Sequence, residues 1–313
     1  MQSSWGDIEV SDAHVHFFSH GFFSALAAQL TARSPGVPAT AESIAALLGW
    51  QAAPREPEEL ASTWAKELDR QGVQHAALIA SVPGDESSVA AAVRSHPDRF
   101  YGYFMVDPTA PGAIGRVRAA LAGGYLHCIC LFPAMHRYSV QDERIRSVLE
   151  AAAERPGVGI FVHCGVLTVG VRGKLGLPSP FDMRFSNPID LHAVALAFPQ
   201  LRFIIPHFGA GYFREALMLC DLCPNVHLDT SSSNSWIRYQ TEPIDLAGVF
   251  RRALDVAGPE RLLFGSDSSF FPRGWHKAIF EVQVQALQQL GISGADARRI
   301  FGSNLRRILA KVG

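Results

Sequence analysis

Residues 202–222 read RFIIPHFGAGYFREALMLCDL, and this stretch holds one complete strand, turn and helix. The apolar, β-branched run at 202–207 predicts a buried strand, and the glycines at 209 and 211 predict a turn. Residues 211–222 carry apolar side chains at helical spacing, which predicts an amphipathic helix. A strand followed closely by a helix is the unit from which parallel sheets are built.

The same unit recurs along the whole chain. We predict eight strands, at 8–14, 73–82, 101–106, 126–132, 159–163, 202–207, 226–230 and 261–266. Helices are predicted between and after them, at 58–71, 86–96, 113–122, 142–154, 188–198, 211–222, 244–257, 276–290 and near 295–310. Eight alternations with short connections favour a closed parallel (β/α)8 barrel, a TIM barrel of the α/β class, over an open sheet. We therefore predict a single domain over residues 1–313.

Two predicted strand-to-helix connections are long. They span residues 17–57, after the first strand, and 164–187, after the fifth. Loops of this kind crown the end of a barrel where ligands bind, so we expect lids or substrate walls rather than domain boundaries. Within the first insertion, residues 39–48 predict a short helix.

Composition narrows the range of partners. The chain has 28 Lys and Arg against 29 Asp and Glu, and 48% of its residues are hydrophobic. Without a basic cluster, a nucleic-acid or anionic-membrane partner is not expected, and a small-molecule substrate is. Residues 1–10 lack a leader pattern and no apolar run is long enough to span a membrane, so we expect a cytoplasmic protein. Five cysteines, an odd number, predict reduced thiols.

Two histidines end the first predicted strand. His14 and His16 occupy alternate positions in DAHVH, residues 12–16. Side chains alternate across a strand, so both imidazoles point to the same face. Two such rings can close on a metal ion if other strands supply further ligands.

Three further predicted strands end in groups able to bind metal or move protons. His163 ends the fifth strand, His207 the sixth, and Asp267 follows the eighth. The carboxyl ends of barrel strands form one ring, so these groups are expected to meet His14 and His16 at one rim.

These motifs resemble those of the amidohydrolase superfamily. The resemblance lies in D-x-H-x-H at 12–16, H-x-G at 163–165 and 207–209, and G-S-D at 265–267. More narrowly, the stretches at 186–188, 198–199, 206–211 and 302–304 resemble the branch that contains metal-dependent hydrolases together with aminocarboxymuconate-semialdehyde and resorcylate decarboxylases. The similarity extends from about residue 12 to the C-terminal helix and is weakest over 17–57.

The resemblance implies a metal site and its ligands. One divalent metal ion would be bound by His14, His16, His163 and Asp267, with His207 beside it as a proton-transfer or polarising group. Three imidazoles, a carboxylate and an open position suit Zn²⁺ best, and Mn²⁺ or Fe²⁺ are chemically acceptable alternatives.

The fourth predicted strand favours one metal ion over two. Binuclear members of the superfamily use a bridging Lys or Glu from this strand, and residues 126–132 contain neither. Cys128 or Cys130 stays open as a soft substitute ligand.

Three functions fit this set of groups. The first is hydrolysis of a small carboxylate-bearing lactone, amide or ester by metal-activated water, with Asp267 taking the proton and His207 stabilising charge on the attacked carbonyl oxygen. The second is non-oxidative decarboxylation of an aromatic or unsaturated acid. The third is a barrel that binds a metal or ligand without turnover.

Substrate-binding residues are expected on the loops of the same rim. Arginine clamps carboxylates and aromatic walls suit planar acids, so five residues are predicted to bind substrate: Arg184, Arg172, Trp236, Phe271 and Trp275. Lys174, Phe270 and Arg273 lie on the same loops, and His20, His136 and His276 are open candidates for a pocket role. Barrels with extended lids often dimerise, so a homodimer is also considered.

Overall fold

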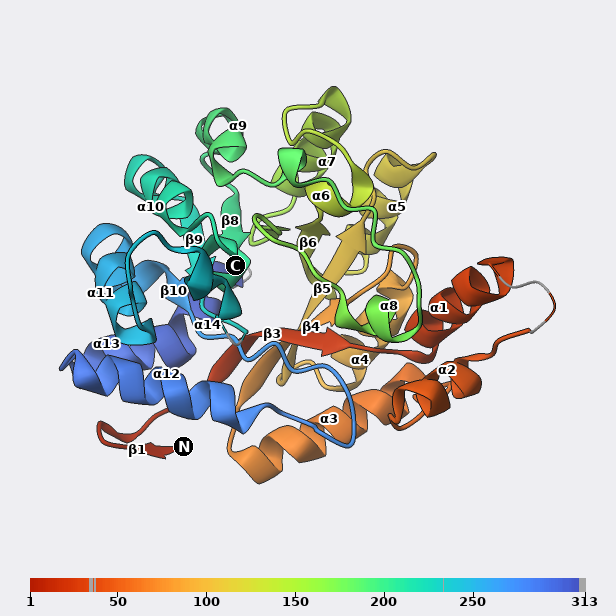
Figure 1. Ribbon diagram of the computed structural model, residues 1–313, viewed down its shortest axis with the longest axis horizontal. Coiled ribbons are helices and arrows are strands. Elements are labelled where there is room, and N and C mark those ends of the chain that lie inside the picture. Colours follow the sequence, from red (N-terminus) through yellow and green to blue (C-terminus); the bar gives the residue numbers. More distant parts are fainter. Residues whose placement is uncertain (34–35, 37, 233, 310–313) are drawn as a thin grey trace.

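The chain folds into a barrel of eight parallel strands surrounded by helices, as a computed structural model shows for residues 1–33, 36, 38–232 and 234–309 (Figure 1). The strands from β3 to β10 lie in the sheet in their sequence order, so each strand pairs with the next strand of the chain. Their bounds are β3 (Ser11–Phe17), β4 (His75–Ala80), β5 (Phe100–Val106), β6 (Leu126–Leu131), β7 (Gly159–Val162), β8 (Arg202–Ile205), β9 (Val226–Asp229) and β10 (Leu262–Leu263). All eight predicted strands are present, with ends that differ by a few residues.

Hydrogen bonds between β3 and the segment after β10 close the barrel. The amide of Ala13 donates to the carbonyl of Phe264 at 2.8 Å, and the amide of Asp267 donates to the carbonyl of His14 at 3.0 Å. A further bond joins the amide of His16 to the carbonyl of Ser268 at 2.7 Å. The prediction of a closed (β/α)8 barrel is therefore confirmed.

The outer helices follow the strands in the predicted order. They are α3 (Pro57–Gln71), α4 (Glu86–Ser95), α5 (Ala113–Ala122), α7 (Glu143–Ala153), α9 (His192–Ala197), α10 (Phe213–Leu222), α11 (Leu246–Ala257) and α12 (Lys277–Gln289). The predicted helix at 295–310 consists of α13 (Gly294–Arg298), a π-helical turn (Arg299–Ser303) and α14 (Asn304–Leu309), and residue 310 lies outside the described part. In the described residues, no helix is long and apolar enough to cross a membrane.

An N-terminal hairpin precedes the barrel. It consists of β1 (Gln2–Ser3) and β2 (Gly6–Asp7), which pair antiparallel and were not predicted. Trp5 at its turn donates its indole N–H to the carbonyl of Ile292 at 3.1 Å and packs near the Phe301 ring. The hairpin is thereby attached to the C-terminal helical segment.

Two apolar layers hold the barrel together. Alternate strand residues fill its interior, among them Ile79, Tyr103, Phe161 and Ile204. The opposite faces of the strands pack against the surrounding helices and form the larger core. Because each strand is buried on both sides, the predicted strands are nearly continuous apolar runs.

A third apolar cluster forms a lid over one side of the rim. It joins α1 (His20–Arg33) and α2 (Ala41–Leu48), both from the 17–57 insertion, to α8 (Gly170–Lys174) from the loop after β7 (Figure 1). The short helix predicted at 39–48 is therefore present as α2. Helix α1 was not predicted, although Phe22, Phe23, Leu26 and Ala27 give it a buried face.

We predict that the interior layer dominates stability. Ile204 is 1% exposed in the barrel, and Ile204→Ala should lower the free energy of unfolding by about 2–5 kcal/mol because it leaves a cavity. Val282→Ala, on the solvent face of α12 at 45% exposure, is the matched control and should change it by no more than about 0.5 kcal/mol. Urea unfolding measures both, and equal losses would contradict the layered core.

Candidate metal centre

Barrel closure brings three metal-competent side chains together. His14 and His16 project from β3, and Asp267 follows β10. The Nε2 atoms of His16 and His14 are 3.2 Å and 3.7 Å from the same Asp267 oxygen, Oδ1. The ligand atoms of all three lie within 4.8 Å of one another. Atoms bound to one ion at about 2.1 Å lie within about 4.2 Å of each other, so this cluster could hold a metal ion.

Hydrogen bonds orient both histidines for this role. The Nδ1 atom of His14 is 2.7 Å from Oδ2 of the buried Asp229. The Nδ1 atom of His16 is 2.7 Å from Oγ of Ser81, whose hydroxyl donates to the carbonyl of Ile79. Ser81 must therefore accept from His16. Both rings carry a proton on Nδ1 and direct Nε2 towards Asp267, the arrangement typical of metal-binding histidines.

His163 places a third imidazole at the same cavity. It follows β7, and its buried Nδ1 has no hydrogen-bond partner among the described residues. Burial, and then the charges of neighbouring His207 and His14, hold the pKa of His163 well below its usual value. A neutral, unpartnered imidazole nitrogen beside other ligands fits a metal ion, because buried nitrogens normally find a partner.

The histidines and carboxylates of the cluster stabilise one another's charged forms. Burial would lower the pKa of His14, but Asp229, Asp267 and Asp12 raise it to about 9. Burial would raise the pKa of Asp267, yet its hydrogen bond to His16 and the charge of His14 hold it below the usual range. Asp267 is therefore ionised at neutral pH, as a metal-binding carboxylate must be.

His207 is held beside the cluster by an unusual turn. It follows β8 in a 3-10 turn (Pro206–Gly209), and His207 and Phe208 both have positive φ angles, of 57° and 53°. Its ring centroid lies 5.0 Å from that of His14 and 5.3 Å from that of His163. Left-handed backbone is costly for non-glycine residues, and strained residues of this kind often occur at functional sites.

The sequence analysis did not single out the residues that support the cluster. Asp12 accepts from the amides of His14 and Ser266 and from the Trp275 indole, and Asp229 holds His14. A Cβ on Gly265 would lie only 2.6 Å from Asp229 Oδ1, so glycine is required there. Asp229 ends β9, so the rule that selected His163 would also have found it.

A cavity of about 320 Å³ lies above these groups. Its walls are mainly apolar and include Phe18, Phe22, Trp50, Met105, Phe132, Met135, Leu167 and Phe270. Two cations, Lys174 and Arg273, also line it, and neither forms an ion pair within the described residues. All five predicted catalytic and metal-binding residues line this cavity: His14, His16, His163, His207 and Asp267.

Stacked aromatic rings join the lid to the barrel along this cavity. Trp50 of the 17–57 insertion stacks on Phe270 at 4.2 Å between centroids, and Phe18 stacks on Phe22 at 4.0 Å. Arg273 sits 4.5 Å from the centroid of Phe270. The stack fixes the position of this cation at the cavity wall.

The two arginines predicted to bind substrate point elsewhere. Arg184 is exposed and pairs with Asp182 at 2.6 Å. Arg172 donates to Gln29 of α1 and to the carbonyl of Pro178, which ties the fifth loop to the lid. Sequence placed both on the correct loop, but local hydrogen bonds turn their guanidinium groups away from the cavity.

The three predicted substrate-binding aromatics are packing residues. Trp236 is buried against Phe213 and donates its indole N–H to Asn234. Phe271 packs on Trp64 at 4.7 Å, and Trp275 lies beneath the site, where it holds Asp12. In the described residues, the cavity wall contains none of the three. Phe270 and Arg273 of the same loop line the cavity instead.

The open histidine candidates also lie outside the cavity wall as described. His20 is 3.5 Å from Glu42 and links α1 to α2. His136, in α6 (Pro133–His136), packs near Tyr138, and the amide of His276 donates to Ser268. None of these contacts involves the metal-competent cluster.

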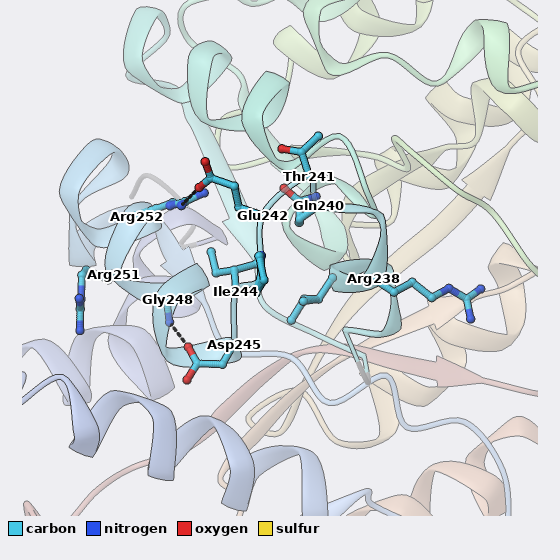
Figure 2. Close-up of a pocket in the computed structure, with 11 residues that line it drawn as sticks. Arg238, Gln240, Thr241, Glu242, Ile244, Asp245, Gly248, Arg251 and Arg252 are labelled. Atoms are coloured by element: carbon cyan, nitrogen blue, oxygen red, sulfur yellow. Dashed lines mark hydrogen bonds and ion pairs between the residues drawn. The ribbon is translucent and has the colours of Figure 1, made fainter.

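A larger but open depression of about 850 Å³ lies away from the cluster (Figure 2). It is formed by residues 237–252, at the start of α11 and in the loop before it. Arg252 pairs with Glu242 at 3.8 Å, and the Asp245 side chain caps α11 by accepting from Gly248. Several of its polar groups pair locally and it is more open than the cavity over the histidines, which is therefore the better candidate site.

The same fold occurs in several solved structures. The 5-carboxyvanillate decarboxylase of Sphingomonas paucimobilis matches with a TM-score of 0.64 and 16% identity over 98% of this chain and 100% of that one. A probable 2-pyrone-4,6-dicarboxylic acid hydrolase of Acinetobacter baumannii, with citric acid bound, matches with a TM-score of 0.57 and 16% identity over 96% of this chain and 99% of that one. A zinc-bound amidohydrolase of Burkholderia multivorans matches with a TM-score of 0.59 and 18% identity over 97% of this chain and 99% of that one. Such identities show the fold alone.

Sequence comparison identifies the family. Over 87 residues the chain is 30% identical to Protein fluG of Emericella nidulans, a match that covers 28% of this chain and 10% of that protein. The matched segment is thus about a tenth of that relative's length. The family model described as Amidohydrolase matches residues 11–311, nearly the whole barrel with its metal-competent rim. The chain therefore belongs to the amidohydrolase family.

Proposed function

We propose that this protein is a mononuclear metal-dependent hydrolase of a small carboxylate-bearing lactone, amide or ester. The observation that carries the proposal is the convergence of the His14 and His16 Nε2 atoms on Asp267 Oδ1 in the wall of one cavity. The unpartnered Nδ1 of His163 at the same cavity supports a four-residue ligand set: His14, His16, His163 and Asp267.

One metal ion suits this site better than two. Phe132, just beyond β6, stacks on His163 with ring centroids 5.4 Å apart. An apolar ring thus lies where the fourth barrel strand would need to present a bridging ligand. Cys128 and Cys130 are buried in the barrel interior below the rim. Zn²⁺ best matches three imidazoles and one carboxylate, with Mn²⁺ or Fe²⁺ as alternatives.

The residues around the ion divide the chemistry. A bound divalent ion supplies Lewis acidity and lowers the pKa of water to about 7. Asp267, ionised and 3.2 Å from His16, can accept a proton from the attacking water and pass it to the leaving group. His207, whose ring centroid lies 5.0 Å from that of His14 and 5.3 Å from that of His163, can donate a hydrogen bond to the substrate oxygen as negative charge develops.

The cavity wall favours a substrate with an acidic group. Lys174 and Arg273 line the cavity without carboxylate partners, and the remaining wall is mainly apolar. Arginine binds a carboxylate with two parallel hydrogen bonds, and 320 Å³ accommodates a small organic acid. These two cations take the role first expected of Arg172 and Arg184.

Decarboxylation of an aromatic or unsaturated acid is the second candidate. The ring-lined wall formed by Phe18, Trp50 and Phe132 favours a planar substrate, and the same acid–base groups would serve. Hydrolysis incorporates one water oxygen into the product, whereas decarboxylation releases carbon dioxide. Turnover in ¹⁸O-labelled water, followed by mass spectrometry, therefore separates them. Unlabelled product with release of carbon dioxide would overturn the hydrolase proposal.

We predict about one divalent ion per purified chain. His14→Ala and His163→Ala should each reduce the metal content severalfold, because each removes a proposed ligand. His96→Ala, at the end of α4, is the matched control and should leave it unchanged. Elemental analysis after loading with zinc measures this. A wild-type protein that stays near zero would refute the metal site.

We predict separate roles for His207 and Asp267. His207→Ala should keep the metal but lower kcat about 10²–10³-fold, as expected for loss of one donor to the developing charge. The readouts are metal content and turnover of a panel of carboxylated lactones, amides and aromatic acids. Loss of metal in His207→Ala would instead make His207 a ligand. If Asp267→Asn changed metal affinity alone, a non-catalytic barrel would be favoured.

We predict that the two cavity cations set KM. Lys174→Ala and Arg273→Ala should each raise KM for an acidic substrate about tenfold to a hundredfold, because each removes a charged hydrogen bond. Arg184→Ala is the control, since its guanidinium pairs with Asp182. Steady-state kinetics on the best panel substrate measures this. An effect confined to Arg184→Ala would restore the sequence-based expectation.

A further inference from the structure

Ser231 lies between His14 and His207. It follows β9 and is fully buried. Its Oγ is 3.0 Å from Nδ1 of His14 and 2.9 Å from Nδ1 of His207. One hydroxyl thus touches the rear nitrogen of a proposed metal ligand and that of the proposed polarising group.

Hydrogen counting shows where the Ser231 proton must go. Nδ1 of His14 faces the Asp229 carboxylate at 2.7 Å, a distance that requires a proton on this nitrogen. The proton stays there whether Nε2 binds a metal or carries its own proton. His14 therefore cannot accept a hydrogen bond from Ser231, and the remaining acceptor with a recorded contact is Nδ1 of His207.

We propose that Ser231 is a positioning residue that fixes His207 in the tautomer with its proton on Nε2. In this arrangement the Ser231 hydroxyl donates to the bare Nδ1 of His207, and the His207 Nε2–H points into the cavity. The arrangement concerns this chain's own hydrogen bonds and does not require knowledge of the substrate.

The opposite tautomer satisfies these groups less well. A proton on His207 Nδ1 could be donated to the Ser231 Oγ at 2.9 Å or to the Ser231 carbonyl at 3.3 Å. The Ser231 hydroxyl would then lose its acceptor among the described residues while remaining fully buried. A buried donor without a partner is unfavourable, and this disfavours the tautomer with the proton on Nδ1.

His207 is also expected to be neutral. Only a neutral ring has a bare Nδ1 that can accept from the Ser231 hydroxyl 2.9 Å away. A neutral ring with Nε2–H is a hydrogen-bond donor to the substrate and cannot act as a base through the same nitrogen. Resting on the proposed function, this assigns His207 to polarise the substrate oxygen and leaves proton acceptance to Asp267.

Nuclear magnetic resonance of ¹⁵N-histidine-labelled, zinc-loaded protein tests the proposal directly. Long-range ¹H–¹⁵N correlations distinguish the two neutral tautomers, and His207→Gln assigns the relevant signals. We expect the His207 proton on Nε2 in the wild type. A proton on Nδ1 would overturn the proposal, and this measurement needs neither a variant of Ser231 nor a substrate.

Variants then identify the cause. Ser231→Ala should shift the His207 proton to Nδ1, because only the carbonyl acceptor remains, and should keep the metal. Asp229→Asn should weaken metal binding about 10–100-fold, because Asp229 holds the Nδ1 atom of His14. Ser186→Ala is the matched control, since this buried hydroxyl donates to the Met183 carbonyl. An unchanged tautomer in Ser231→Ala would also overturn the proposal.

These outcomes separate the proposal from the proposed function. An Nε2–H tautomer lost in Ser231→Ala supports the role of Ser231 even if no panel compound is hydrolysed. Conversely, if a panel compound is hydrolysed while His207 is protonated on Nδ1, the proposed hydrolase function stands and the proposed role of Ser231 is rejected. In Ser231→Ala we expect kcat to fall while KM stays nearly unchanged, because the lost donor acts mainly on developing charge.

Discussion

Closure of the barrel between β3 and the segment after β10 is the constraint on which the site depends. The Asp267 amide bonds to the carbonyl of His14, and Asp12 accepts from the amide of Ser266, 254 positions away. These bonds hold the backbone of β3 and the backbone of the segment after β10 side by side. The imidazoles of His14 and His16 are thereby delivered to the Asp267 carboxylate without any flexible element between them.

Beneath the cluster, hydrogen bonds between buried polar groups, rather than apolar packing, hold the side chains in place. Asp12, Asp229 and Ser231 are buried, and each has hydrogen-bond partners that belong to the site. Burial raises the pKa of Asp12 to about 6 despite its hydrogen bonds from Ser266, His14 and Trp275. Buried polar networks of this kind are costly unless fully satisfied, so they specify one arrangement of the side chains above them.

The substrate side of the site is built differently. Its walls come from the 17–57 insertion and from the loops after β7 and β10, joined by ring stacking between Trp50 and Phe270. Such contacts depend on apolar area and shape, and they can change without disturbing the ligands below. The loops of such a barrel can therefore vary while the strand ends beneath them keep their arrangement.

The sequence by itself determined the eight strand–helix units, the barrel and the five side chains at its rim, because strand periodicity and strand ends are local properties of the chain. It did not determine which loop residues face the cavity: Arg172, Arg184 and Trp236 sit on the expected loops but turn away. Nor did it reveal that Ser231 joins His14 to His207. Loop orientation and hydrogen-bond partners depend on segments far apart in sequence, so only the tertiary structure decided them.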